Sequence, residues 1–183
     1  MTDTPLQVLQ HDLIAEFDRD SRGRAVSRLL GEYCTRHSDW RRHAMFDGQH
    51  YTRNLVTRNE CFEMLVLCWS RGQRSPIHNH AGQSCWMAVL DGEMQETLYA
   101  PIVRGGEALA ETQTKTLVAG RVAFIRDEIA LHRVMPVAGG EGVSLHLYSR
   151  PIDVCNVYDE SSGEVVAKQL AYYSVDGVRC GAR

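Results

Sequence analysis

The stretch GQRSPIHNHAGQSCWMAVLDG, residues 72–92, carries the strongest structural signal in the chain. It holds two histidines separated by one residue, His78 and His80, followed by an apolar run that ends at Asp91-Gly92. In a β-strand, residues i and i+2 project from the same face, so both imidazole rings can reach one point. Imidazole is the commonest protein ligand of transition metals. The spacing favours a metal site, although two solvated histidines near a turn would give the same pattern.

The spacing around these histidines resembles the first motif of the cupin family, G-x5-H-x-H-x4-E-x6-G. The matching residues are Gly72, His78, His80 and Gly92, with Cys85 in the place of the glutamate. A third histidine, His132, lies in a later apolar segment, where the second cupin motif has its ligand. The match there is looser, because Gly120 is one residue farther away and Pro136 replaces the usual asparagine.

The missing glutamate bears on the chemistry of such a site. Three neutral imidazoles leave a divalent ion with its full charge, whereas two histidines and a carboxylate neutralise part of it. A more positive site accepts an anionic thiolate as a further ligand. Three protein ligands on one face also leave about three positions open for substrate atoms and dioxygen.

Hydrophobic periodicity predicts an N-terminal helical cap followed by many short strands. One helix is expected over 5–18, a second capped by Asp20 or Ser21 and running through Tyr33, and a third after Ser38-Asp39. The predicted strands are 62–69, 85–90, 94–99, 112–118, 122–125, 131–134, 143–148, 154–158 and 165–172. Asp91-Gly92 is interpreted as a hairpin turn and Gly105-Gly106 as another turn.

Short strands separated by turns indicate a closed antiparallel barrel or a sandwich. With the cupin resemblance, the expected fold is mainly β: a cupin-type antiparallel β-barrel (jelly roll) with a short N-terminal helical cap. We expect one domain over residues 1–183, with the cap over about 1–45 and the barrel over about 46–183.

Composition narrows the class of partner. The net charge of -3 argues against nucleic acid, whose partners usually carry a basic face. No basic segment followed by an apolar one starts the chain, and no apolar run is long enough to cross a bilayer. The six cysteines include no C-x-x-C pair and are expected to be thiols. We expect a cytoplasmic monomer that binds neither nucleic acid nor membrane.

Two segments place polar residues on a strand face. In 143–148, apolar residues alternate with Ser144, His146 and Tyr148. Burying these groups unpaired would cost roughly 1–3 kcal/mol each, so they form either a solvated face or a polar relay beside the metal. Tyr51 and Arg53 also share a face. The guanidinium either pairs with an acidic neighbour, which the pattern alone favours, or binds a ligand carboxylate.

Six ordered segments together resemble the cysteine dioxygenases, cupins that oxidise free L-cysteine to cysteine sulfinate. They are YTRNLV (51–56), LCW (67–69), HNH with Cys85, L-x-G-x-x-x-ETL (90–98), LHRV (131–134) and SLHLYS (144–149). Many bacterial members have glycine where Cys85 stands, so the chain resembles a bacterial type that retains this cysteine.

The resemblance implies a role for each matching residue. One Fe(II) per chain would bind His78, His80 and His132, and the substrates would be L-cysteine and O2. Arg53 would hold the substrate carboxylate with Tyr51 beside it. Cys85 would form a thioether with Tyr148, and Ser144 and His146 would orient the Tyr148 hydroxyl. Leu67 and Trp69 would line or support the pocket wall.

Two other readings of the site stay open. The chain could oxidise another small thiol, such as 3-mercaptopropionate or cysteamine, but Arg53 argues against both. The mercaptopropionate branch typically has glutamine at this position, and cysteamine has no carboxylate. The chain could also be a non-enzymatic metal-binding cupin. Such a module has no need for a relay of Ser144, His146 and Tyr148 next to a crosslinkable Cys85.

Overall fold

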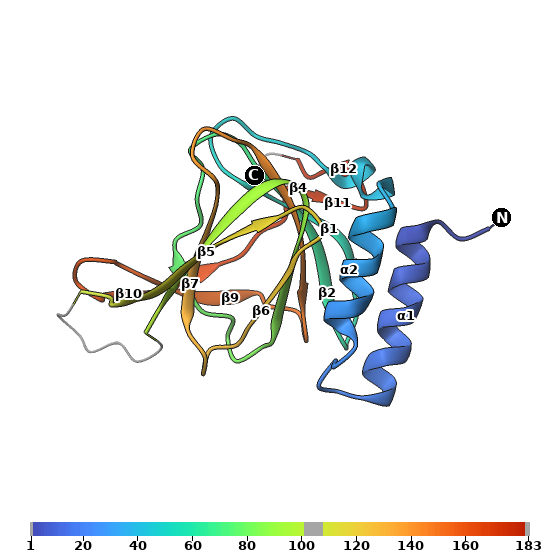
Figure 1. Ribbon diagram of the computed structural model, residues 1–183, viewed down its shortest axis with the longest axis horizontal. Coiled ribbons are helices and arrows are strands. Elements are labelled where there is room, and N and C mark those ends of the chain that lie inside the picture. Colours follow the sequence, from blue (N-terminus) through green and yellow to red (C-terminus); the bar gives the residue numbers. More distant parts are fainter. Residues whose placement is uncertain (1, 101–107, 182–183) are drawn as a thin grey trace.

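The computed structural model describes residues 2–100 and 108–181, and Figure 1 shows two helices packed against one side of a β-structure. The helical elements are α1 (Pro5–Arg19), α2 (Val26–Arg36) and the 3-10 helix η1 (Asp39–His43). The strands are β1 (Thr52–Arg58), β2 (Glu63–Trp69), β3 (Ile77–His78), β4 (Cys85–Tyr99), β5 (Glu111–Val118), β6 (Val122–Ile125), β7 (Leu131–Pro136), β8 (Gly142–Tyr148), β9 (Val154–Tyr158), β10 (Val165–Gln169), β11 (Ser174–Val175) and β12 (Val178–Arg179).

The helical cap forms as its sequence predicts, with one correction. Thr4 and Gln7 form a capping box at the start of α1, with Pro5 as the first helical residue. The prediction that Asp20 or Ser21 caps the second helix is wrong, because Asp20 ends α1 and Ala25 is the N-cap of α2. The N-terminus of α2 is stabilised from α1, because the buried carboxylate of Glu16 accepts a hydrogen bond from the Ala25 amide at 2.7 Å. Charge complementarity with the helix dipole supports this arrangement.

The apolar face of the cap packs on the outer face of β2, β4 and β8. Phe17 of α1 contacts Phe62 and Trp86, with ring centroids 5.7 and 6.1 Å apart. These residues belong to one buried apolar cluster that also contains Leu6, Leu13 and Leu30 from the helices and Leu145 and Leu147 from β8. None of the helices in the described ranges is long and apolar enough to span a membrane. The cap therefore buries one side of the sheet and leaves the other side to a second core.

The strands pair in the order β10-β9-β3-β7-β4-β8-β2-β1-β11-β12, with β5 and β6 also pairing with β4. All pairs are antiparallel except β1 with β11, among the residues described. This mainly β jelly roll with an N-terminal helical cap confirms the expected fold class. The barrel is not closed by hydrogen bonds, because the order of described strands ends at β10 and β12.

The predicted hairpin at Asp91-Gly92 is wrong, because both residues lie inside the single strand β4. The register of β4 against β8 shifts between Val89 and Asp91, which marks a β-bulge. Gly92 has φ +74° there, and a Cβ would lie 2.3 Å from the Glu141 carbonyl oxygen. The bulge changes which residues face the inner core: Cys85, Met87 and Val89 before it, Met94 and Leu98 after it. Because the inward-facing positions change from odd to even residue numbers at the bulge, the sequence pattern resembles that of two separate strands. The Gly105-Gly106 turn lies outside the described residues.

Candidate metal centre and pocket

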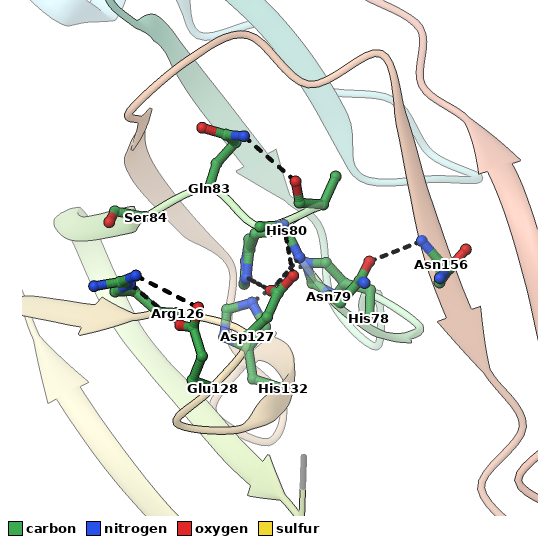
Figure 2. Close-up of polar contacts among 12 residues, drawn as sticks. His78, Asn79, His80, Gln83, Ser84, Arg126, Asp127, Glu128, His132 and Asn156 are labelled. Atoms are coloured by element: carbon green, nitrogen blue, oxygen red, sulfur yellow. Dashed lines mark hydrogen bonds and ion pairs between the residues drawn. The ribbon is translucent and has the colours of Figure 1, made fainter. Parts of the chain in front are cut away.

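Three histidines converge inside the β-structure, in the arrangement that their spacing predicts (Figure 2). His78 ends β3 and pairs directly with His132 of β7 in the strand register. His80 follows two residues later, and the ligand nitrogens of all three lie within 4.8 Å of one another. Between them, Asn79 turns away, and its Oδ1 accepts a hydrogen bond from the Asn156 amide at 2.9 Å. The pairing of β3 with β7 and β9 therefore holds the cluster in place.

Each histidine has an oxygen beside its Nδ1 atom. The Nδ1 of His132 is 2.7 Å from Glu96 Oε1, and that of His78 is 3.0 Å from the Pro76 carbonyl oxygen. The Nδ1 of His80 is 3.5 Å from Asp127 Oδ1, a longer contact. For His78 and His132 such an acceptor keeps the proton on Nδ1 and directs the Nε2 lone pair inward, whereas the Nδ1 of His80 has no hydrogen-bond partner among the described residues. The cluster thus offers three nitrogen donors to one point.

The donors fit a divalent metal ion. With the proton on Nδ1, the Nε2 atoms of His78 and His132 are both acceptors, yet they lie 3.3 Å apart. The Nε2 of His80 is buried without a hydrogen-bond partner among the described residues. Leaving such acceptors unpaired is unfavourable, and a cation between them would satisfy all three.

The electrostatics also suit metal binding. Burial lowers the pKa of His78 well below its ordinary value and that of His80 to about 4, so both rings are neutral at pH 7. Burial alone would raise the pKa of Glu96, but hydrogen bonds from His132 and Lys115 lower it to about 2. The ion pair of Glu96 Oε2 with Lys115 Nζ is 2.8 Å long. Glu96 is therefore an anion that strengthens His132 as a donor.

A pocket opens over the histidines, and its wall contains the residues expected there. Tyr51, Leu67 and Trp69 line it together with His78 and His80. Tyr51 and Trp69 stack with ring centroids 4.4 Å apart. Further apolar wall comes from Val134, Ile152, Cys155, Val157 and Leu170. The result is a small, mostly apolar pocket with few polar groups directed into it, a composition typical of ligand sites.

The polar face of β8 is buried and forms a chain of contacts. Trp69 Nε1 donates to Ser144 Oγ at 2.9 Å, and Ser144 Oγ lies 3.0 Å from His146 Nε2. Tyr148 Oη lies 3.4 Å from His146 Nδ1. If the Ser144 hydroxyl, which accepts from Trp69, donates to Nε2, the neutral ring carries its proton on Nδ1 and donates to Tyr148. The Tyr148 hydroxyl hydrogen is then left to donate into the pocket.

The sequence leaves open whether Arg53 pairs with an acidic neighbour or binds a ligand carboxylate, and its surroundings allow both. Its side chain is 11% exposed, and the nearest carboxylate, Glu63 Oε2, is 3.9 Å from Nη2. That distance allows an ion pair but not a hydrogen bond. Nε and Nη2 have no hydrogen-bond partner among the described residues. The guanidinium lies 5.9 Å from the Tyr148 ring centroid at the pocket wall. It keeps its capacity to bind a carboxylate.

Cys85 and Tyr148 are direct neighbours across β4 and β8. They are Cα partners in the antiparallel register, and both are buried. Side chains at such positions have Cβ atoms about 4.5–5.5 Å apart. Burial raises the pKa of the Cys85 thiol and of the Tyr148 hydroxyl well above their ordinary values. Both groups therefore carry their protons at pH 7.

Comparison with known proteins agrees with this geometry. Residues 1–161 match the protein family described as cysteine dioxygenase type I. The chain belongs to this family. It is 37% identical over 157 residues to cysteine dioxygenase type 1 of Rattus norvegicus, covering 84% of this chain and 78% of that protein. The corresponding human protein is 35% identical over 156 residues, with the same coverage. The Danio rerio protein is 35% identical over 157 residues, again with the same coverage.

Sequence reasoning missed the residues that support the ligands in this member of the cysteine dioxygenase family. Glu96 and Asp127 lie 36 and 47 residues from the histidines that they contact. For Glu96 a signal was present, since it is a carboxylate between the core residues Met94 and Leu98 in an alternating strand. Asp127 lies in a polar turn after β6 and carries no such signal.

The Glu96 contact predicts a loss of metal affinity when its charge is removed. Glu96→Gln keeps an acceptor for His132 but no longer increases the donor strength of the ring. Loss of such a partner typically weakens metal binding about 10- to 100-fold. Titration with a divalent ion measures this change, with the exposed Glu93 of the same strand, changed to Gln, as the matched control. Equal affinities for the two variants would contradict the role of Glu96.

Proposed function

We propose that the chain is a cysteine dioxygenase, which adds both atoms of O2 to the sulfur of free L-cysteine and gives cysteine sulfinic acid. The observation that carries this function is a cluster of three histidines, of which His78 and His80 line a pocket, together with Arg53 in the same lining, whose Nε and Nη2 have no hydrogen-bond partner among the described residues. The first suits a metal and the second suits a carboxylate. Family membership supports the same reaction.

The metal proposed for His78, His80 and His132 is iron(II), one ion per chain. Imidazole also binds zinc, nickel and copper, so the donors alone do not select iron. Dioxygen chemistry requires a redox-active ion, and this requirement favours iron over zinc. When bound, the ion would supply the redox chemistry and lower the pKa of the substrate thiol. The expected single domain, monomeric state and cytoplasmic location stay predictions.

The protein groups bind and orient the substrate. Arg53 would hold the carboxylate through its planar guanidinium, with the Tyr51 hydroxyl beside it. This contact fixes one end of a molecule whose other end carries the thiol, so the sulfur is held over the histidines. Fixed geometry makes the oxidation effectively intramolecular. The apolar wall of Leu67, Trp69 and Ile152 excludes water from the reacting sulfur.

Tyr148 would act as the hydrogen-bond donor of the pocket. Its pKa is raised by burial, so the hydroxyl keeps its proton and can donate to oxygen as negative charge develops there. His146 and Ser144 would orient it through the contacts described above. Their role is positioning, and the charge-stabilising contact is that of Tyr148.

We propose a thioether between Cys85 and Tyr148, which the family resemblance implies and which the pairing of the two residues across β4 and β8 supports. Sγ would bond to the ring carbon next to the hydroxyl, and O2 would take up the two hydrogens lost. Intact-mass analysis after turnover should show a species lighter by about two hydrogen atoms. Cys85→Ser should abolish this species, whereas Cys155→Ser, which changes a buried cysteine that lines the pocket, should retain it. A mass deficit that persists in Cys85→Ser would place the link elsewhere.

The test of the function is oxygen uptake by metal-loaded protein, combined with metal analysis. We expect iron-loaded protein to consume O2 with L-cysteine much faster than with 3-mercaptopropionate or cysteamine, and zinc-loaded protein to consume none. Faster uptake with 3-mercaptopropionate would assign another thiol. No uptake with any thiol would favour a non-enzymatic metal-binding module.

A further inference from the structure

Behind Arg53 lies a carboxylate that is completely buried. Glu63 begins β2 and has no exposed side-chain surface. In the strand register it stands between Arg58 of β1 and Tyr148 of β8. Its Oε2 accepts from the Ile152 amide at 3.3 Å, and its Oε1 accepts from the Tyr172 hydroxyl. A buried anion of this kind needs both hydrogen bonds and a nearby cation.

Two arginines lie near Glu63, but one of them has another partner. Arg58 forms a two-point contact with Asp153, with Nη1–Oδ1 at 2.8 Å and Nη2–Oδ2 at 3.0 Å. Its Nη1 is only within 3.9 Å of Glu63. Arg53 is the opposite case, because the carboxylate nearest to its guanidinium is Glu63. Thus Arg58 is neutralised at the surface by Asp153, and the charge of Glu63 is directed to Arg53.

The segment that follows β10 completes this arrangement. The Tyr173 amide donates to the Arg53 carbonyl oxygen at 2.8 Å, so the segment runs beside β1 at the position of Arg53. The Tyr172 hydroxyl donates to Glu63 and accepts from Arg58 Nη1 at 2.6 Å. Leu170 of the same segment lines the pocket. Two hydrogen bonds therefore hold Glu63, one from the amide of Ile152 in the loop before β9 and one from the Tyr172 hydroxyl.

We infer that Glu63 is a positioning residue: its carboxylate, held by Tyr172 and Ile152, keeps the Arg53 guanidinium at the pocket wall and makes the pocket select thiols that bear a carboxylate. Glu63 approaches Arg53 without forming a hydrogen bond, so it orients the cation and leaves its donors available. This inference rests on the proposed role of Arg53 in binding the substrate carboxylate.

The test compares two thiols that differ by the carboxylate. Binding of L-cysteine and of cysteamine to iron-loaded protein is measured without O2, and turnover is measured separately. Glu63→Gln removes the charge but keeps the side-chain shape and an acceptor for Tyr172. It should weaken L-cysteine binding about 10-fold and raise KM similarly, with kcat and cysteamine binding changed by less than about twofold.

Two further variants control for a loss of structure. Glu60→Gln removes an exposed carboxylate from the turn just before β2 and should leave L-cysteine binding within about twofold of the unmodified protein. Tyr172→Phe keeps the Glu63 charge but removes a hydrogen bond to it, so it should weaken L-cysteine binding about threefold and spare cysteamine. If Glu63→Gln does not fold, Tyr172→Phe makes the same comparison.

An equal loss of affinity for both thiols, or no loss for either, would overturn the inference. Failure of the inference can be distinguished from failure of the proposed function. The proposed function fails if the unmodified protein takes up no O2 with L-cysteine. A selective loss of L-cysteine binding in Glu63→Gln supports the inference even then, because binding is measured without turnover. If Arg53→Ala leaves L-cysteine binding unchanged, the inference falls with the role of Arg53.

Discussion

Replacing His132 with alanine is expected to abolish O2 uptake with L-cysteine and to reduce bound iron to less than about a tenth of that in the unmodified protein. His132 is completely buried, pairs with His78 across the two strands and has Glu96 behind it. The two remaining histidines would leave an incomplete donor set, and Glu96 would have no ligand to support. Iron content and O2 uptake measure the change directly.

The same variant should lose the stabilisation that metal binding supplies. A ligand at about 100 times its Kd stabilises the folded state by about 2.7 kcal/mol, which corresponds to a rise in Tm of about 5–10 °C for a domain of this size. The unmodified protein should show this rise when a divalent ion is added, and His132→Ala should not. His11→Ala, in the exposed face of α1, is the matched control and should behave as the unmodified protein does. A metal-dependent rise in His132→Ala would remove His132 from the ligand set.

Local patterns in the sequence predict the parts of this fold that depend on near neighbours. The capping box of Thr4 and Gln7 and the alternation of β8 are of this kind, and both are found in the structure. The spacing of His78 and His80 likewise predicts their convergence, because two residues along a strand return to the same face. The error at Asp91-Gly92 has the same origin, since a bulge and a hairpin both interrupt the alternation and both favour glycine.

The contacts that complete the site depend on strand order, which local patterns do not contain. Glu96 meets His132 only because β4 pairs with β7, and Cys85 meets Tyr148 only because β4 also pairs with β8. The contact of Cys85 with Tyr148 is predicted by the family resemblance and not by their spacing in the sequence. Glu63 shows the limit most clearly, because its two hydrogen bonds come from Ile152 and Tyr172, which lie 89 and 109 residues away in the sequence.

Replacing Arg53 with alanine is expected to raise KM for L-cysteine by about 30- to 1000-fold, the equivalent of about 2–4 kcal/mol. The guanidinium is largely buried, so water weakens its attraction for a carboxylate much less than at the surface. The variant also leaves Glu63 without its nearest uncommitted cation. Iron content should be unchanged, because Arg53 has no contact with the three histidines. Steady-state O2 uptake at fixed iron loading measures KM and kcat.

The decisive comparison in this variant is between thiols rather than between proteins. Cysteamine lacks the group that Arg53 would bind, so its activity should fall far less than that of L-cysteine, and the preference of the pocket for L-cysteine should disappear. Lys168→Ala removes an exposed cation that lines the same pocket and should change KM by less than about threefold. If Arg53→Ala and Lys168→Ala change KM equally, general attraction for anions explains the preference. If Arg53→Ala alone removes it, the carboxylate is recognised at one buried position, and Arg53 defines the substrate class.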